Sequence, residues 1–431
     1  MKGKGLRWWI IGLIALATVI NYIDRTALAV MWPEVSKDLG MDKNDYANIL
    51  LIFTVAYGLG KGLFGRIMDW IGVRFGFVLA IFVWSVAAAL HAVARGVGGF
   101  AFYRVLLGLG ESGNWPGATK ASAIWFPIKE RAFAQGIFNS GAALGSVIAA
   151  PSIAFLYLAV GWKATFVIIG AVGLLWIIPW WIINKANPDK HPWLSDEERE
   201  YILSGQKTQA EADEATPAYS WGKLLTFKET WAILISRFLI DPIWWLFVNW
   251  LPIYLAESFG FQIKDIGAFA WLPYVGAALG SLSGGWVAAR WIGRGMQVGK
   301  VRKSIITIGG MIMLPCLIMT AFASTPMVAI TLIGLILFGF QFVIGNLQTL
   351  PSDFFSGKSV GSVAGLGGLA ASAGVLVTTK IVPMLSADGN YLNVFLLGAV
   401  LVPLGVAAIY LLGGNIERVK TTGKAPHTHS V

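Results

Sequence analysis

Long apolar segments alternate with short polar ones along the whole chain. A helix needs about 20 apolar residues to cross the hydrocarbon core of a bilayer, and glycine and proline are tolerated inside such helices. The pattern therefore predicts twelve membrane-spanning helices. They are expected at 8–34, 45–68, 73–95, 98–125, 132–158, 162–184, 226–257, 264–290, 303–323, 326–352, 359–384 and 389–413.

The composition supports a polytopic membrane protein. Of the 431 residues, 56% are hydrophobic and 13% are charged, whereas a soluble domain has roughly 25% charged residues. The net charge of +10 agrees with basic residues placed in cytoplasmic loops, so it does not indicate a nucleic-acid partner. The partner that we expect for this surface is the lipid bilayer.

Lysine and arginine gather in alternate loops. The rich set includes Arg7, Arg74, Arg131, Lys190 and Arg294, whereas the other loops hold few, such as Lys43 and Lys264. Basic loops stay in the cytoplasm, so both termini are expected there, with the protein in a bacterial inner membrane. The first apolar segment is too long for the core of a signal peptide, and we expect it to remain as the first span.

The longest polar interruption runs over 185–223 and divides the chain into two sets of six spans. We expect a first bundle at 1–185, an interdomain loop at 186–223, a second bundle at 224–415 and a cytoplasmic tail at 416–431. Within the loop, Ser195 can cap a short helix that has Glu198 at its third position.

The two halves carry related loops. Gly65, Asp69, Gly72 and Arg74 follow the second span, and a degraded copy with Gly285, Gly293 and Arg294 follows the eighth. Repetition of a six-span unit is typical of transporters built from two bundles around a central site. The sequence therefore predicts an all-α membrane protein with two pseudo-symmetric six-helix bundles.

Charged residues lie inside the apolar segments of the first half. Arg104 and Glu111 are seven residues apart in the fourth span, which places them on one helix face, and Asp24 and Arg25 are adjacent in the first span. A charge at mid-membrane costs at least ~2.5 kcal/mol on insertion scales and usually marks function. Glycines line the same face as Arg104 and allow close approach of a neighbouring helix.

These residue types suit a site that binds an anion and a proton. Arginine presents paired N–H donors that fit a carboxylate. Burial favours the neutral form of a carboxylic acid, and a nearby cation favours the ionised form. An anion that engages the arginine would therefore change how strongly the acid holds its proton, and this linkage is reciprocal.

The loop pattern G-x-x-x-D-x-x-G-x-[RK] resembles the signature of the major facilitator superfamily. The segments NYIDR (21–25) and YRVLLGLGESGNWPGATKASAIWFPIKER (103–131), together with Tyr57, resemble the anion:cation symporter branch, which includes bacterial hexuronate and D-galactonate transporters. The resemblance implies a major facilitator fold. It also implies that Asp24 and Glu111 are protonation sites.

The same resemblance implies further roles. The residues that it places in contact with substrate are Tyr22, Arg25, Tyr57 and Arg104. Asp69 and Arg74 would form a cytoplasmic latch that tunes the conformational equilibrium, and we expect Arg131 to be a partner of Asp69.

Other polar and aromatic side chains are candidates for binding a sugar. In the second half they could read sugar hydroxyls or stack on a sugar face. They are Trp244, Asn249, Tyr274, Asn346 and Gln348. Each has a structural alternative, because the amides can bond neighbouring helices and the aromatics can fill space or anchor at the interface. Lys61 is either an extra anion contact or a side chain that snorkels to the cytoplasmic end.

One position departs from the branch. The resemblance to galactonate transporters implies a glutamine in the fifth span. This chain has Ala142 at the matching place, after Asn139. That difference favours hexuronates, or an unsaturated or keto-deoxy uronate, over galactonate.

We therefore expect a monomeric, proton-coupled symporter that imports a sugar-acid anion by alternating access. The alternatives are another organic anion, of the phthalate, tartrate or glycerate type, and coupling to Na⁺. The sequence has no metal-ligand spacing, catalytic triad pattern or phosphate-binding loop in apolar surroundings. An enzyme, a metal site and a cofactor are therefore not expected.

Overall fold

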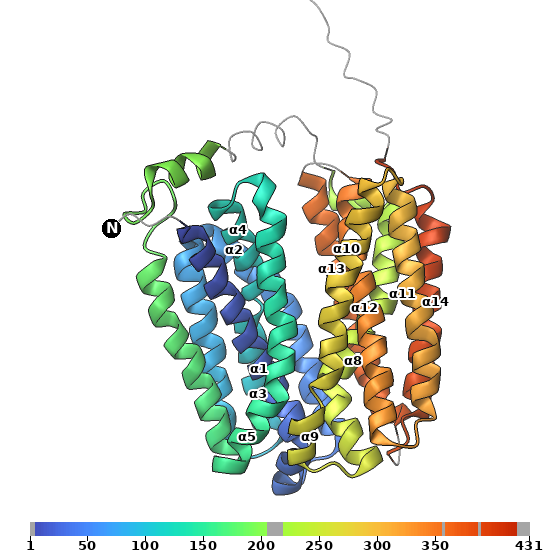
Figure 1. Ribbon diagram of the computed structural model, residues 1–431. Helices are drawn as coiled ribbons and strands as arrows, with labels where there is room; N and C mark the ends of the chain where they lie inside the picture. Colours follow the sequence, from blue (N-terminus) through green and yellow to red (C-terminus); the bar gives the residue numbers. More distant parts are fainter. Residues whose placement is uncertain (1–4, 205–218, 356–357, 387–388, 420–431) are drawn as a thin grey trace, which may run out of the picture.

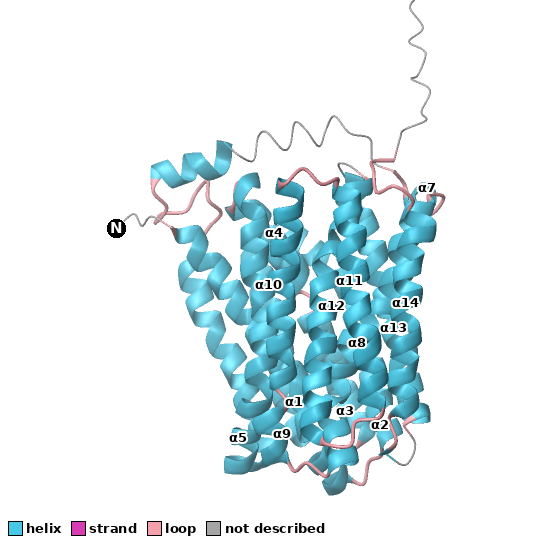
Figure 2. Ribbon diagram, turned by 45° about the vertical axis from the view of Figure 1, so that its right-hand side comes forward, coloured by secondary structure: helices cyan, strands magenta, loops and turns pink. Residues whose placement is uncertain are grey.

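The computed structural model describes residues 5–204, 219–355, 358–386 and 389–419, and this part of the chain consists of helices joined by short loops (Figure 2). The helices are α1 (Leu6–Leu39), α2 (Lys43–Leu90), η1 (His91–Val93), α3 (Val97–Glu111), α4 (Asn114–Trp125), α5 (Ile128–Ile183), α7 (Trp221–Leu224), α8 (Lys228–Phe259), α9 (Ile263–Phe269), α10 (Leu272–Gly293), α11 (Val298–Ala321), α12 (Pro326–Phe354), α13 (Lys358–Leu385) and α14 (Leu392–Gly413). A further helical segment covers 196–204.

Two of these helices each contain two membrane spans. α2 has 48 residues and α5 has 56, and at 1.5 Å per residue either would be about twice as long as a bilayer core is thick. Gly72 (φ 79°) in α2 and Gly161 (φ 74°) in α5 have non-helical backbone angles. Glycine adopts a positive φ without steric cost, so the chain reverses at these positions.

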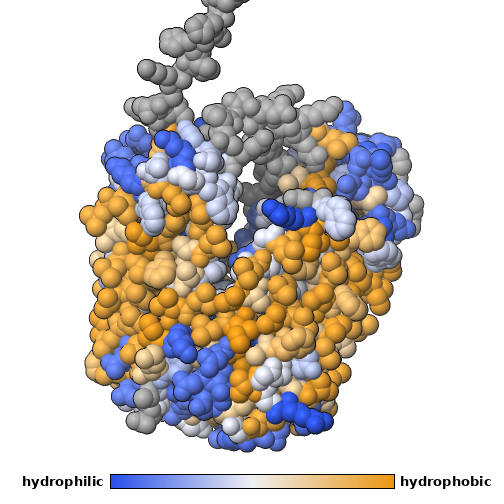
Figure 3. All heavy atoms as spheres, turned by 180° about the vertical axis from the view of Figure 1, so that it is seen from behind, coloured by the Kyte–Doolittle hydropathy of each residue, from blue (hydrophilic) through white to orange (hydrophobic). Residues whose placement is uncertain are grey.

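The structure confirms the twelve predicted spans. Ten described segments are long and apolar enough to cross a membrane, and one of them, 134–183, crosses twice because it contains the reversal at Gly161. The twelfth span consists of α3 followed by α4. It is not among the ten segments because Ser112 and Gly113 divide it into two short helices. On the face shown in Figure 3, a broad apolar belt lies between two polar ends, as expected for a protein that crosses a bilayer.

The spans form two bundles that repeat one arrangement. Helices α1 to α5 make the first bundle, and α8 to α14 make the second (Figure 1). In the first, α1 packs on α5 and α2 on α3; in the second, α8 packs on α13 and α10 on α12. The predicted pseudo-symmetric pair of six-helix bundles is confirmed.

The two ends of the molecule differ. We call the end where α1 begins and where the linker between α5 and α8 lies the linker end, and the other the far end (Figure 1). At the far end the halves are joined by polar contacts: Lys43 Nζ lies 2.6 Å from Glu257 and donates to the Ser386 carbonyl at 2.9 Å. Lys380 donates to Asn48 across the halves at 3.2 Å.

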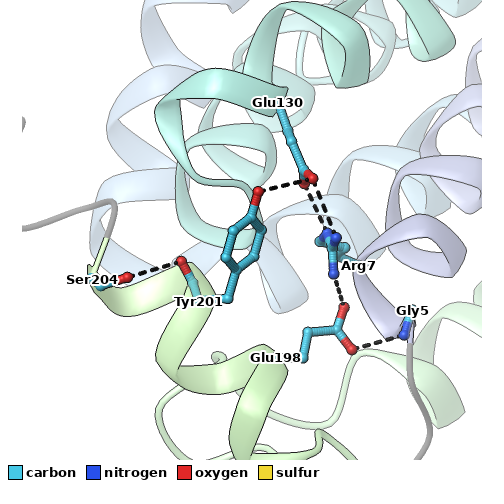
Figure 4. Close-up of polar contacts among 6 residues, drawn as sticks. All are labelled: Gly5, Arg7, Glu130, Glu198, Tyr201 and Ser204. Atoms are coloured by element: carbon cyan, nitrogen blue, oxygen red, sulfur yellow. Dashed lines mark hydrogen bonds and ion pairs between the residues drawn. The ribbon is translucent and has the colours of Figure 1, made fainter.

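At the linker end the surface is hollowed between the two halves (Figure 3). The first part of the linker packs on the first bundle. Ser195 accepts a hydrogen bond from the Glu198 backbone N–H at 3.2 Å, which confirms the predicted helix cap. Arg7 of α1 bonds to Glu130 of α5 at 2.9 Å and to Glu198 at 2.5 Å, and Tyr201 also donates to Glu130 (Figure 4).

Candidate functional site

The backbone of α3 lies very close to α2, and this places the predicted charges. A side chain on Gly108 would meet the Phe53 carbonyl at 2.7 Å, and one on Gly110 would meet the Trp84 backbone nitrogen at 2.6 Å. These two glycines point about 200° apart on the helix, so α3 packs closely against both spans of α2, and only Gly108 lies on the face of Arg104. Arg104 and Glu111, on the same helix, are 1% and 0% exposed, so they face protein and not lipid.

The first ion pair of the site joins two different helices. Glu111 Oε2 accepts from Arg25 Nε at 2.8 Å and lies 2.6 Å from Arg25 Nη2. Asn21, one turn earlier on α1, accepts from the same guanidinium at 3.2 Å. The sequence places Arg25 beside Asp24 and Glu111 on the face of Arg104, but the structure pairs Arg25 with Glu111.

The second pair of charges is close but not bonded. Arg104 donates only to the Arg25 carbonyl, at 3.3 Å, and its Nε and Nη2 are buried without a hydrogen-bond partner. Both carboxylate oxygens of Asp24, which is 1% exposed, likewise have no well-formed hydrogen bond within the described residues, although the buried indole N–H of Trp84 lies near them. Arg25 Nη1 and Glu111 Oε1 are also buried and unpaired. An unpaired buried polar atom costs free energy, and the roles of these four side chains in binding substrate and protons stay predictions.

Aromatic rings surround the Arg25 guanidinium. The distances from its Cζ atom to the ring centroids are 4.7 Å for Tyr57, 5.0 Å for Trp245, 5.2 Å for Tyr22 and 5.5 Å for Phe53. The Arg104 guanidinium lies 5.7 Å from the same Phe53 ring. Faces of aromatic rings attract cations, so the rings stabilise a positive charge that water does not reach.

Lys61 lies next to this group. Its Nζ is 4.5 Å from the Tyr57 ring centroid, and the side chain is partly buried. It therefore shares a helix face with Tyr57, as the one-turn spacing predicts. Whether it contacts an anion stays a prediction.

The aromatic candidates of the second half pack within it. Trp244 stacks on Phe340 at 5.8 Å and meets Tyr274 edge-on at 5.8 Å, and it also lies near Tyr22. The Tyr274 hydroxyl donates to the Phe247 carbonyl at 3.2 Å. The Asn249 carbonyl accepts from Tyr46 of the first half at 2.6 Å. These contacts hold the helices of the second half and its border with the first.

The polar candidates on α12 lie in other surroundings. The Asn346 amide oxygen accepts from Arg302 of α11 at 2.8 Å, and Arg302 also pairs with Asp353 at 2.9 Å. Gln348 is exposed. In α8, Arg237 donates to Asp241, one turn away, at 2.6 Å and 2.9 Å.

The predicted latch is only partly described. The side chains of Asp69 and Arg131 lie outside the described residues. Arg74 donates to the carbonyls of Lys185 and Trp181 at 2.8 Å and 3.2 Å. It therefore caps the end of α5 in its own half, and its part in a latch stays a prediction.

One residue of the site, Phe53, escaped the sequence analysis as a candidate contact. Phe53 precedes Tyr57 by one helical turn, and this spacing places both rings on one face of α2. Trp245 is adjacent to Trp244, and adjacent residues of a helix point in directions about 100° apart. The spacing of Phe53 was available in the sequence, but the orientation of Trp245 depends on how α8 packs.

A match to a known protein family identifies the class of this protein. The family profile described as the Major Facilitator Superfamily matches residues 14–379. The chain belongs to the major facilitator superfamily. It is therefore a membrane transporter and not an enzyme.

Relatives of this transporter match it over most or all of its length. The "Hexuronate transporter" of Escherichia coli (strain K12) is 33% identical over 432 residues, which cover 100% of this chain and 98% of the relative. The "Galacturonate transporter" of Dickeya chrysanthemi is 35% identical over 315 residues, which cover 73% of this chain and 90% of the relative. The predicted resemblance to hexuronate transporters is confirmed.

A solved structure supports the fold of this major facilitator transporter. It is a bacterial homologue of the human lysosomal transporter Spinster in an inward-facing and occupied conformation. The TM-score is 0.72 at 16% identity, and the match covers 96% of this chain and 98% of that one.

Proposed function

We propose that this transporter imports a hexuronate, such as glucuronate or galacturonate, together with protons. The observation that carries the proposal is the buried group of Asp24, Arg25, Arg104 and Glu111, with unpaired polar atoms on all four side chains. Arginine N–H groups suit the carboxylate of a sugar acid, and buried carboxylates suit a transported proton.

The proposed coupling follows from the pairing. Glu111 is held by Arg25. A substrate carboxylate that binds the unpaired donors of Arg104 and Arg25 competes with the acids for positive charge. The acids are then more readily protonated, and a proton and an anion bind together because each favours the other.

The choice of a hexuronate rests on two observations. The relatives that match over the greatest length include a hexuronate transporter, at 33% identity. Ala142 occupies the place where the resemblance to galactonate transporters implies a glutamine. We assign hydroxyl recognition to the interface of the two halves, where Tyr22 lies near Trp244 and Arg25 lies under the ring of Trp245.

Uptake into proteoliposomes tests this function. With an acidic exterior, we expect labelled glucuronate to accumulate above its external concentration, and a protonophore should abolish this accumulation. Galacturonate should compete, and galactonate or sulfoacetate should compete less. Accumulation that requires a Na⁺ gradient would show Na⁺ coupling instead, and passive equilibration would indicate a channel.

Alternating access is supported by the difference between the two ends. The far end is joined by Lys43–Glu257 and Lys380–Asn48, whereas the linker end is hollowed between the halves (Figure 3). In the proposed cycle, the far-end contacts break when the linker end closes. The two bundles rock about the site between them.

A cross-link at the far end tests alternating access. We expect cysteines at Asn48 and Lys380, placed in a Cys316→Ser background and joined by a short bifunctional reagent, to stop transport by more than about tenfold, because the far end can no longer open. Cleavage of the reagent should restore uptake.

The control for the cross-link joins two helices of one half. The Thr307 hydroxyl of α11 lies 2.9 Å from the Tyr410 hydroxyl of α14. Cysteines at these positions, joined by the same reagent, are expected to leave transport largely intact. Full transport by the cross-linked far-end variant would contradict alternating access through this end.

A further inference from the structure

The rings around Arg25 come from both halves of the protein. Tyr22, Phe53 and Tyr57 belong to the first bundle, and Trp245 belongs to α8 of the second. Trp245 is 5.0 Å from the guanidinium carbon and meets the Tyr57 ring at 6.5 Å and 63°. The second half therefore contacts the buried cation of the first half through a π face.

Trp245 differs from its neighbour Trp244 in its surroundings. Trp244 is 6% exposed and stacks on Phe340 inside the second bundle. Trp245 is only partly buried, and its ring lies over Arg25. Consecutive residues of a helix point about 100° apart, so the two rings have different neighbours: Trp244 lies against Phe340 and near Tyr22, whereas Trp245 lies over Arg25.

The attraction between Arg25 and this ring depends on charge. An aromatic face attracts a cation through its quadrupole, and tryptophan does so best among the aromatic residues. Arg25 has one carboxylate partner, Glu111, and its Nη1 is unpaired. The rings therefore fix where the unpaired donor points, and the ring of Trp245 is the contribution of the second half.

We propose that Trp245 is a positioning residue: its ring holds the Arg25 guanidinium in the orientation that receives the substrate carboxylate, and it links occupancy of Arg25 to the second bundle. This inference rests on the proposed function. It assigns to Trp245 an action on Arg25, whereas stacking of a sugar face on this ring would be an action on the substrate.

A double-mutant cycle on the substrate-free protein tests the contact. Trp245→Leu is made in the wild type and in a neutral background, Arg25→Gln with Glu111→Gln, and thermal unfolding is followed in detergent. If the ring binds the charge, Trp245→Leu lowers the melting temperature more in the wild type than in the neutral background. Equal decreases mean packing alone and would overturn the proposal.

Affinity for glucuronate gives the second measurement. Trp245→Leu is expected to bind about tenfold more weakly than the wild type, and Trp245→Phe, which keeps a π face, no more than about threefold more weakly. Equal losses for leucine and phenylalanine would overturn the inference. Trp286→Leu is the matched control, because Trp286 of α10 is 62% exposed and lies away from Arg25.

The two measurements separate this inference from the proposed function. If the wild type binds no sugar acid, the proposed function fails, and the cycle still decides whether Trp245 holds Arg25. If the wild type binds glucuronate and Trp245→Leu binds it equally well, the inference fails and the proposed function stands.

Discussion

Glu111→Gln is expected to abolish accumulation of the sugar acid while exchange continues. Glutamine keeps the shape of the side chain and resembles its protonated form, so the site can bind and release anion but cannot release a proton. We expect accumulation driven by a pH gradient to fall to the equilibrium ratio of inside to outside concentration, because the anion no longer moves together with a proton. Counterflow of labelled against unlabelled glucuronate should retain roughly half of its rate or more, because exchange requires no net proton movement.

The control for Glu111 is a buried carboxylate elsewhere. Asp241 is 7% exposed and is paired with Arg237 one turn away in α8. Asp241→Asn is expected to leave the ratio of accumulation to exchange unchanged, even if the amount of folded protein falls. A Glu111→Gln protein that accumulates substrate like the wild type would remove Glu111 from the coupling mechanism.

Arg104→Gln is expected to prevent substrate binding. Two of its guanidinium nitrogens are buried and unpaired, so they are the largest set of free donors that we find for a carboxylate in the site. Loss of one partner of a buried charge pair costs about 2–5 kcal/mol, which corresponds to a loss of affinity of about 30-fold to several thousand-fold. This loss of affinity is measured by the binding of glucuronate to the purified variant and to the purified wild type.

A second variant separates binding from folding. Removal of Arg104 leaves the two buried acids with one cation, so part of the effect could be instability. Asp24→Asn combined with Arg104→Gln keeps the charge of the site balanced and should restore thermal stability toward the wild type. It should still fail to bind glucuronate; recovery of normal affinity would show that Arg104 does not hold the carboxylate.

The sequence was sufficient for the architecture because the bilayer restricts the choices. Apolar length predicted each span, and the twelve-span arrangement was found. Charges in apolar surroundings pointed to Asp24, Arg25, Arg104 and Glu111, and the structure places all four together and buried. These predictions rest on the free-energy cost of exposing charge to lipid. Charged residues within apolar segments can be identified from the sequence alone.

The sequence could not decide which charges pair. Arg25 and Glu111 are 86 positions apart, and local spacing favoured Asp24 for one and Arg104 for the other. Contacts between distant spans depend on how closely the helices approach, and here the glycines of α3 determine that approach. In the same way, which of the two adjacent rings, Trp244 or Trp245, contacts Arg25 depends on the rotation of α8 about its axis. The sequence does not show this rotation.

The bonds from Arg7 to Glu130 and Glu198 make residues 196–204 part of the first bundle (Figure 4). Glu200 is exposed on this helix, and Met296, between α10 and α11, is 42% exposed on the second bundle. Because the chain has one cysteine, Cys316, a Cys316→Ser protein with cysteines at 200 and 296 can carry one fluorophore on each bundle. Energy transfer between the two dyes then reports the separation of the bundles in single molecules, with the linker helix serving as a rigid handle on the first.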